Sequence, residues 1–428
     1  MMLVEFSFSN YRSFRDKATL SMEAAGLGAF KNSLISCNSL KLLPGAGLFG
    51  KNGGGKSNVI RAFWLAAQFI QNAQRTQHDG AHVPVTPFLL DGHSAQTPSS
   101  FAFIYVFDQT KYWYGFSATR EKLTEEYLYH APKGQKALVF RREGQEFTFT
   151  EDRAKRSMIA EAVAENQLFF SVACTMNDAV CVRAMRWFRE HLFFSQDYSD
   201  LPSQLIEYAE DSNMLRAISD YAKAADLGID DVRFEFDNQN VDVQSPLPAE
   251  MPEDLRAALT QFLRTITQGS HGPSVRMEMG RITAKTIHPG ENGPYELNLT
   301  DESDGTKKLM ALAPAIESVL QKGGVLLADE LERELHPTLV NLILSKFQSK
   351  RTNPNGAQII FTTHNTELLN LELLRKDQIY LVDKQSRTGV SELYSISDFA
   401  TRTSDNIHKG YLIGKYGAVP NVELEEVE

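Results

Sequence analysis

A glycine-rich stretch from Gly50 to Ser57 has the residue types and the spacing of a phosphate-binding loop. It reads GKNGGGKS, a full match to the pattern G-x-x-x-x-G-K-[ST]. Glycines let successive backbone N–H groups point at phosphate oxygens, and Lys56 would place a cation between the β- and γ-phosphates of a nucleotide. The Ser57 hydroxyl would be a ligand of Mg²⁺. The residues predicted to contact a nucleotide are Asn52, Gly53, Gly54, Gly55, Lys56, Ser57 and Asn58.

Two carboxylates follow an apolar run in the second half of the chain. Val325 to Ala328 has the composition of a buried parallel strand, and Asp329 and Glu330 come directly after it. Asp329 would hold Mg²⁺ through water. Glu330 would orient the attacking water, because phosphoryl transfer depends on positioning and charge stabilisation. We therefore predict Glu330 and Lys56 as catalytic residues and Asp329 as a metal ligand.

A histidine ends the next apolar run. Residues 358–361 are followed by Thr362, Thr363 and His364. A histidine at this place could contact the γ-phosphate as a donor or sensor, although a lone histidine can equally be structural. The order of the three motifs, with the loop first, the acidic strand second and the histidine strand third, favours a catalytic role for His364.

A polar segment precedes a long apolar helix pattern. It reads ESDGTKK over residues 302–308, and Ser303 lies 329 − 303 = 26 residues before Asp329. Ser303 could cap the N-terminus of the helix, and a helix N-terminus can bind an anion. We count Ser303 and Gly305 among the candidate nucleotide contacts, although the motif is weak by itself.

The flanking sequence predicts the elements that would position these residues. Residues 3–9 and 41–49 contain strand patterns, and a helical pattern covers 57–76. Five consecutive antiparallel strands are expected between residues 101 and 150, rich in Phe, Tyr, Val and Thr. Helices are expected over 158–165, 179–192, 214–227 and 253–267, a strand over 274–287, and alternating helices and strands after Pro294.

Composition limits the class of protein. The 428 residues carry 44 Lys and Arg against 54 Asp and Glu, a formal charge of −10, which argues against a basic coat for nucleic acid. Short basic clusters occur nonetheless, and the one at Arg183, Arg186 and Arg189 could be the solvated face of a helix. Cys37, Cys174 and Cys181 are too few for a disulfide framework, and we expect reduced thiols, no membrane span and a cytoplasmic location.

The chain resembles the ABC-class ATPases related to SMC, RecF and OLD proteins. Four segments carry the resemblance: FSNYRSFRD, GKNGGGKSN, ESDGTKKL, and VLLADELERELHP with FTTHNTELL. It implies an ATP site shared between two protomers, with segment 303–308 of one meeting the γ-phosphate held by the other. It also implies that Arg12 contacts the nucleotide and that Glu332 and His336 lie at the dimer interface. Pro337 can also be explained structurally, because proline is common as the first residue of a helix.

The sequence is similar over nearly its whole length to the small AAA-type ATPases of anti-phage abortive-infection systems, such as the AbiL and PARIS ATPase subunits. NQLFFSVA, MRWFREHLFF, LGIDDVRFEF and YLIGKYGAVPNV carry this similarity. Glu334 departs from the small residue common there. The ABC Q-loop glutamine has no clear counterpart, and its expected place is Thr86 to Phe88. The resemblance implies ATP and Mg²⁺ as cofactors and a separately encoded effector, often a Toprim-like nuclease.

Two absences bear on the choice within this class. No long heptad array separates the halves of the site, and only 428 − 364 = 64 residues follow His364, without the carboxylate array of a Toprim domain. We therefore expect an α/β fold, an ABC-type P-loop ATPase head with an inserted antiparallel β layer and a helical subdomain. The expected ranges are 1–100 and 291–428 for the head, 101–152 for the β layer and 153–290 for a helical and mixed insertion.

The expected function is that of an ATP-hydrolysing subunit that self-associates around ATP and controls a nuclease effector in response to a phage-encoded trigger. A RecF-like DNA-repair or DNA-clamp ATPase is the alternative, and it predicts DNA binding that weakens with salt. A non-hydrolysing scaffold that uses ATP only as structural glue is a third possibility, against which the intact acidic pair argues.

Overall fold

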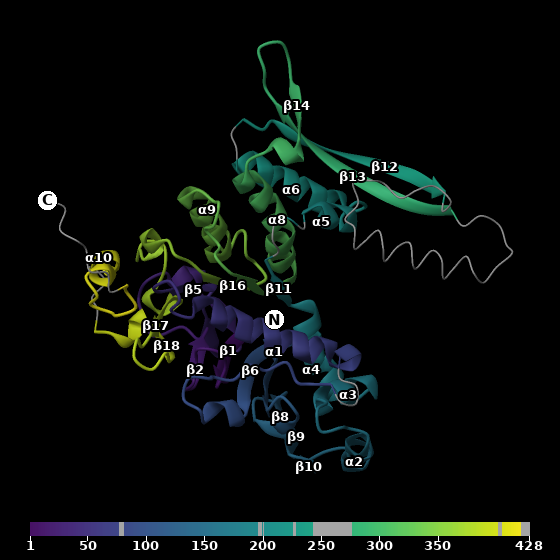
Figure 1. The fold of residues 1–428 in the computed structure, drawn as a ribbon, viewed down its shortest axis with the longest axis vertical. Helices are drawn as coiled ribbons and strands as arrows, with labels where there is room; N and C mark the ends of the chain where they lie inside the picture. The colour runs from purple at the N-terminus through teal and green to yellow at the C-terminus, as the bar shows by residue number, and fades with distance from the viewer. Residues whose placement is uncertain are drawn as a thin grey trace. The chain divides into compact units, whose positions relative to one another are not determined.

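The computed structural model describes residues 1–76, 81–195, 199, 201–225, 228–242, 276–400 and 405–420 (Figure 1). Two compact units are present. The first contains residues 1–195 and 315–428, and the second contains residues 196–314. The boundary falls inside helix α8 (Asp304–Lys322). All residues of the predicted phosphate loop, the acidic pair and His364 belong to the first unit.

A six-stranded sheet positions the predicted site residues of the first unit. Its order is β11-β15-β16-β5-β17-β18, and neighbouring strands are parallel except for the β17–β18 pair. The bounds are Leu192–Phe194 for β11, Gly324–Ala328 for β15, Ala357–Thr362 for β16, Gly45–Phe49 for β5, Ile379–Lys384 for β17 and Ser391–Ser395 for β18. Strands β5, β15 and β16 are buried along their whole length, as expected for strands covered on both faces.

A seven-stranded antiparallel sheet forms the second layer of the same unit. Its order is β10-β9-β8-β7-β6-β1-β2, so the five strands expected between 101 and 150 pair consecutively and continue into the N-terminal strands. The bounds are Met2–Ser9, Ala18–Ser21, Ser99–Phe107, Thr110–Ala118, Leu123–Ala131, Ala137–Glu143 and Glu146–Phe149 for β1, β2 and β6 to β10. A small hairpin, β3 (Ile35–Cys37) with β4 (Leu40–Leu42), accompanies it.

One aromatic core joins the two sheets through helix α1 (Lys56–Thr76). Phe63 of this helix packs on Phe6 of β1 and Phe103 of β6, with ring centroids 4.7 and 5.1 Å apart. Along the first six residues of β6, buried residues alternate with partly buried ones, as expected when one face of a strand is covered. The helix that begins at the phosphate loop is therefore held along its buried face by the β layer.

Shorter helices complete the first unit. They are α2 (Arg153–Glu161), α3 (Phe169–Thr175), α4 (Ala179–Glu190), α9 (Pro337–Gln348) and α10 (Ile407–Leu412). The expectation of a helix over 158–165 is wrong in its second half, because α2 ends at Glu161 and the chain turns through Val163. Sequence patterns also missed α3 and strand β11. Both segments are only a few residues long, and in both a run of apolar residues carries no clear period.

The second unit contains helices α5 (Leu201–Glu207) and α6 (Ser212–Ala225) and a three-stranded sheet. The strands are β12 (Asp231–Asp242), β13 (Arg276–His288) and β14 (Tyr295–Asn298), paired antiparallel. The strand expected over 274–287 matches β13 closely. The helix expected over 253–267 lies outside the described residues.

Two further expectations concern the whole chain. Cys37, Cys174 and Cys181 are free thiols and all three are buried. No helix in the described ranges is long and apolar enough to cross a membrane.

Candidate functional site

The phosphate loop lies between strand β5 and helix α1, in the strand–loop–helix order that its sequence predicts. Gly50, Gly53 and Gly55 have φ values of +146°, +71° and +112°, which residues with a side chain rarely adopt. A Cβ on Gly50 would lie 2.2 Å from the carbonyl oxygen of Val382 in β17. Glycine is therefore required by both the backbone conformation and the close approach of the neighbouring strand.

Lys56 is the first residue of α1 and its ammonium folds back over the loop. Its Nζ donates to the carbonyl oxygens of Gly50 at 2.7 Å and Lys51 at 3.3 Å. Burial lowers the pKa of Lys56, and the carboxylates of Glu332, Glu330 and Asp329 partly oppose that shift. Because these two partners are neutral carbonyl groups, a phosphate could replace them as the partner of this cation.

Thr362 joins the two predicted acids. It ends β16, its side chain is buried, and its hydroxyl donates to Asp329 Oδ1 at 2.6 Å. Thr362 Oγ1 in turn accepts the backbone N–H of Glu330 at 2.7 Å. Glu330 has a φ of +49°, a conformation that costs energy outside glycine and that recurs at functional sites. Thr362 thus fixes the turn that presents both carboxylates, a role that the sequence patterns did not assign.

His364 brings the loop and the acids together. Its Nδ1 lies 3.4 Å from Nζ of Lys56, and its Nε2 lies 3.8 Å from Oε1 of Glu330. The backbone N–H of His364 donates to the carboxylate of Glu332. The carboxyl ends of β5, β16 and β15 meet at one edge of the parallel sheet, so three motifs far apart in sequence become one cluster.

The N-terminal turn from Asn10 to Ser13 also contacts the phosphate loop. Ser13 Oγ accepts from the side-chain amide of Asn58 at 2.8 Å, and a Cβ on Gly55 would lie 2.8 Å from the same oxygen. Arg12, next to Ser13, is exposed, and its Nε donates to the Tyr11 hydroxyl at 3.1 Å. Asn58 therefore connects helix α1 to the N-terminal turn and is not merely a residue of the helix surface. The position of Arg12 next to Ser13 agrees with the expected nucleotide contact, which stays a prediction.

Strand β18 supplies a contact that the sequence did not reveal. Ser391 Oγ donates to the Gly54 carbonyl at 2.7 Å, and the Ser391 N–H donates to the Ser13 carbonyl at 2.7 Å. The serine is buried. No motif marks it, because a single serine at the start of a short strand has no distinctive spacing. The N-terminal turn and β18 therefore both brace the phosphate loop, and they are bonded to each other.

The expected Q-loop region and His336, which were named from the resemblance, form hydrogen bonds with neighbouring segments. The expected Q-loop region lies against the N-terminal turn, where the Thr86 carbonyl accepts the N–H of Arg12 at 2.8 Å. His336 caps α9 by accepting the N–H of Thr338 at 3.3 Å, and Pro337 is the first residue of that helix. An interface role for Glu332 and His336 stays a prediction.

The segment around Ser303 belongs to the second unit. Ser303 Oγ accepts the N–H of Thr306 at 3.1 Å, so it caps α8 as its sequence predicts. Gly305 is the second residue of that helix. Glu302, just before the cap, is buried and lies 2.8 Å from Nε2 of His288 in β13.

The residues predicted to bind Mg²⁺ have the right donor atoms. No group of three or more His, Cys, Asp or Glu among the described residues could hold a metal ion alone. Mg²⁺ bound with a nucleotide needs no such group, because it keeps several waters and takes phosphate oxygens as ligands. The Ser57 hydroxyl and the Asp329 carboxylate, the latter oriented by Thr362, are oxygen ligands of the required kind. Bound there, the ion would neutralise charge on the phosphates.

The family of the chain follows from its match to a family model. Residues 46–370 match the family described as "AAA domain, putative AbiEii toxin, Type IV TA system". The match covers more than half of the chain, so the chain belongs to this family. It includes the phosphate loop, the acidic pair and His364. No curated protein sequence matches the chain.

Two solved structures are similar over most of the chain. One is the Smc head domain of Pyrococcus furiosus with an extended coiled coil, bound to the C-terminal domain of ScpA. It is 13% identical, the similarity covers 92% of this chain and 96% of that one, and the TM-score is 0.39. The other is described as the recombination mediator protein RecF-ATPrS in the RecFOR pathway. It is 15% identical, the similarity covers 91% of this chain and 97% of that one, and the TM-score is 0.38. The expected α/β fold, with a phosphate loop in a parallel sheet beside an antiparallel β layer, is confirmed.

Proposed function

We propose that this protein is the ATP-hydrolysing subunit of a two-component anti-phage defence system and controls a separately encoded effector, a Toprim-like nuclease. One observation carries the ATPase part. Lys56, His364 and Glu330 form a chain of contacts of 3.4 and 3.8 Å at the edge of the sheet where the phosphate loop lies. The family description, which names a putative toxin of a type IV toxin–antitoxin system, supports the defence part.

In the proposed reaction, which is the hydrolysis of ATP, each residue of this chain of contacts has a distinct role. The backbone N–H groups of the loop and Lys56 hold the β- and γ-phosphates of ATP. Glu330 orients a water molecule for attack on the γ-phosphorus, and the bond to the bridging β–γ oxygen breaks to give ADP and phosphate. Lys56 and His364 then face the oxygens on which charge is spread in the transition state.

Self-association around ATP is the second part of the proposal. The capped N-terminus of α8, with Ser303 and Gly305, would contact the γ-phosphate held by a second copy of the chain. A nucleotide can shift an assembly only by binding its states differently, and an ATP shared between copies supplies that difference. Hydrolysis would remove the γ-phosphate that bridges the two copies. The copies would then separate, and the effector would be released from them.

Glu330→Gln tests both parts with one variant. We expect turnover to fall at least about a hundredfold, because the water loses its positioning group while ATP still binds. The ATP-bound oligomer should accumulate, which light scattering after gel filtration measures. Glu372→Gln, at an exposed position of the same unit, is the matched control. Unchanged turnover and unchanged oligomeric state in Glu330→Gln would contradict the proposal.

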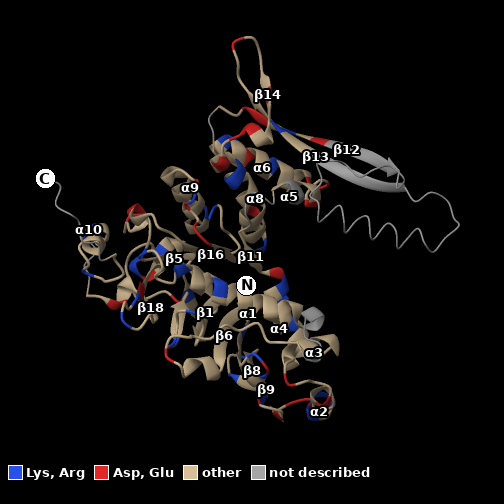
Figure 2. Cartoon of the chain, in the orientation of Figure 1, with Lys and Arg blue, Asp and Glu red and all other residues tan. Residues whose placement is uncertain are grey.

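A RecF-like DNA-clamp ATPase is the second candidate function. Arg183, Arg186 and Arg189 are exposed on one face of α4, as a phosphate-contacting helix requires. Arg186 is already paired with Glu190 at 2.9 Å, and basic and acidic residues are interspersed through the unit (Figure 2). A DNA titration at two salt concentrations separates the candidates. The clamp predicts DNA-stimulated hydrolysis and weaker binding at the higher concentration.

A further inference from the structure

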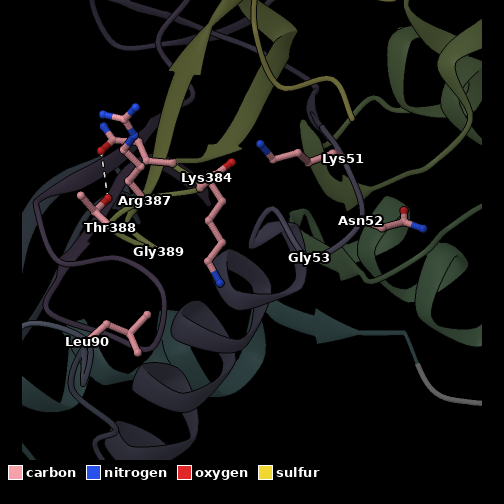
Figure 3. Close-up of a pocket in the computed structure, with 10 residues that line it drawn as sticks. Lys51, Asn52, Gly53, Leu90, Lys384, Arg387, Thr388 and Gly389 are labelled. Carbon is pink, nitrogen blue, oxygen red and sulfur yellow. Dashed lines mark hydrogen bonds between the residues drawn. The ribbon is translucent and has the colours of Figure 1, made fainter. Parts of the chain in front are cut away.

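An open pocket lies beside the phosphate loop, on the side away from the catalytic acids. It has a volume of about 560 Å³, which is within the range of small-molecule sites. One wall is the start of the loop, and the facing wall is the tip of the β17–β18 hairpin (Figure 3). The lining residues are Lys51, Asn52, Gly53, Leu90, Lys384, Gln385, Ser386, Arg387, Thr388 and Gly389.

The strand order shows which end of a nucleotide would face this pocket. Strand β5, which leads into the phosphate loop, has β16 on one side and β17 on the other. The β16 side carries His364 and, one strand further, Glu330, so the γ-phosphate must lie there to react. A triphosphate bound across the loop then directs its opposite end toward β17 and β18.

We propose that this pocket receives the ribose and base of the bound nucleoside triphosphate, and that Arg387 is the residue against which the base stacks. The inference rests on the proposed ATPase function and adds the part of the site that recognises the nucleoside. The pocket and both of its walls lie within the first unit, so one copy of the chain builds it alone.

The chemistry of the hairpin wall suits a nucleoside. A guanidinium is planar and stacks on aromatic faces, and Arg387 is exposed at the hairpin tip. Lys384 extends from the end of β17 alongside the loop in Figure 3, where its ammonium would lie near the α-phosphate. Leu90 adds an apolar contact, and it is 67% exposed. In the described part of the chain, neither Lys384 nor Arg387 forms an ion pair, whereas Lys51 pairs with Asp383 at 2.9 Å.

The hairpin tip is held in shape by its own hydrogen bonds, which leaves Arg387 as the adaptable group. The Gly389 N–H donates to the Gln385 carbonyl at 2.8 Å, and the Thr388 hydroxyl donates to the Gln385 side chain at 2.9 Å. The Gln385 amide also donates to Glu392 at 2.6 Å. Gly389 has a φ of +70°, and a Cβ there would lie 2.4 Å from Leu90. The wall of the pocket is therefore formed before a ligand arrives, and ligand binding does not have to order the turn.

Calorimetry with two probes tests the inference on the full-length chain. The probes are a non-hydrolysable ATP analogue, which carries a nucleoside, and inorganic tripolyphosphate, which does not. In Arg387→Ala we expect the Kd for the analogue to rise about fivefold through loss of the stacking contact, with the tripolyphosphate Kd within about twofold of the parent chain. Arg387→Lys keeps the charge and loses the planar group, so it should not restore the affinity.

The controls separate this inference from the ATPase proposal. Arg351→Ala removes an exposed arginine between α9 and β16, at the opposite end of that strand, and should change neither affinity. Lys56→Ala should weaken both probes, and if it weakens neither, the ATPase proposal itself fails and the inference with it. If Lys56→Ala weakens both probes while Arg387→Ala weakens neither, or weakens both equally, the pocket does not receive the nucleoside and only this inference is overturned.

Discussion

Two groups of charged residues in the first unit differ in how completely the protein itself satisfies them. At the edge of the parallel sheet, Glu330 and His364 have side chains 40% and 43% exposed, and their contact is 3.8 Å long. Within the antiparallel layer, Glu126 and Arg142 are fully buried. The first group is loosely paired and open to solvent, and the second has no access to solvent at all.

The buried group is saturated with partners from three segments of the chain. The Glu126 carboxylate accepts the backbone N–H groups of Phe169 and Phe170, at 2.8 and 2.9 Å, and the Tyr114 hydroxyl at 3.0 Å. Arg142 donates to the carbonyls of Gly144, Gln167, Ala164 and Glu165. Burial raises the pKa of Glu126, which Arg142 and these hydrogen bonds partly oppose. This cluster ties α3 to the sheet and is closed to a ligand, because both side chains are fully buried.

The extent to which protein groups hydrogen-bond a charged residue separates structural from functional charges in this protein. A buried charge must be fully hydrogen-bonded, since leaving it unpaired costs several kcal/mol. A charge that acts on a ligand must keep capacity for it. Lys56 meets this condition because its shortest hydrogen bond goes to the Gly50 carbonyl, a neutral group that a phosphate can replace.

The largest expected effect breaks the saturated cluster. Glu126→Ala should lower the free energy of unfolding by about 3–5 kcal/mol, because Arg142 stays buried without its carboxylate. Urea unfolding followed by fluorescence measures the change. Glu125→Ala is the matched control, since Glu125 is its sequence neighbour, has a side chain 39% exposed and pairs with exposed Arg141 at 3.3 Å. Equal losses in the two variants would show that the buried contacts do not decide the stability.

A smaller effect is expected at the open site. Thr362→Val removes the hydroxyl that orients Asp329 and the Glu330 turn, so the Mg²⁺ concentration for half-maximal turnover should rise about tenfold. Thr362→Ser should restore most of the affinity. Thr363→Val is the control, because Thr363 is also buried but its Oγ1 accepts only the Asn365 N–H in the hydrogen bonds described. An unchanged Mg²⁺ dependence in Thr362→Val would remove Thr362 from the site.

The smallest expected effect concerns the buried pair of Asp178 and Arg156 and its contribution to the pH dependence of stability. Burial raises the pKa of Asp178, but hydrogen bonds from Arg156 and the Cys181 N–H outweigh it, so the pKa is lowered. Its folded pKa lies below its unfolded value of about 3.9, so its stabilisation is present above that pH and is lost as the pH falls through the folded value.

Asp178→Asn should therefore flatten the acid end of the curve of unfolding free energy against pH, measured by urea unfolding at successive pH values. Asp152→Asn is the control, because Asp152 precedes α2 as Asp178 precedes α4 but makes no capping bond with its side chain. If the curve for Asp178→Asn runs parallel to that of the parent chain, Asp178 does not contribute to the pH dependence of stability and the prediction is wrong.

The sequence predicted the elements of the site better than their connections. The phosphate loop, helix α1, the strands that precede Asp329 and His364, and the antiparallel layer all have strong local patterns, and each is present. Short apolar segments such as β11 and α3 have no clear period, and the patterns missed them. Thr362 and Ser391 were not assigned roles, since their contacts come from residues that lie 32 to more than 300 positions away in the chain.

The sequence by itself determined the kind of chemistry. Glycines at 50, 53 and 55, a lysine at 56 and two acids after an apolar strand have few uses other than phosphate binding, because each type is needed at its place for backbone shape or charge. Only the tertiary structure decided that β16 and β17 flank β5, and hence that the proposed catalytic groups and the pocket lie on opposite sides of the loop. Strand order depends on long-range packing, which no local pattern of residues encodes.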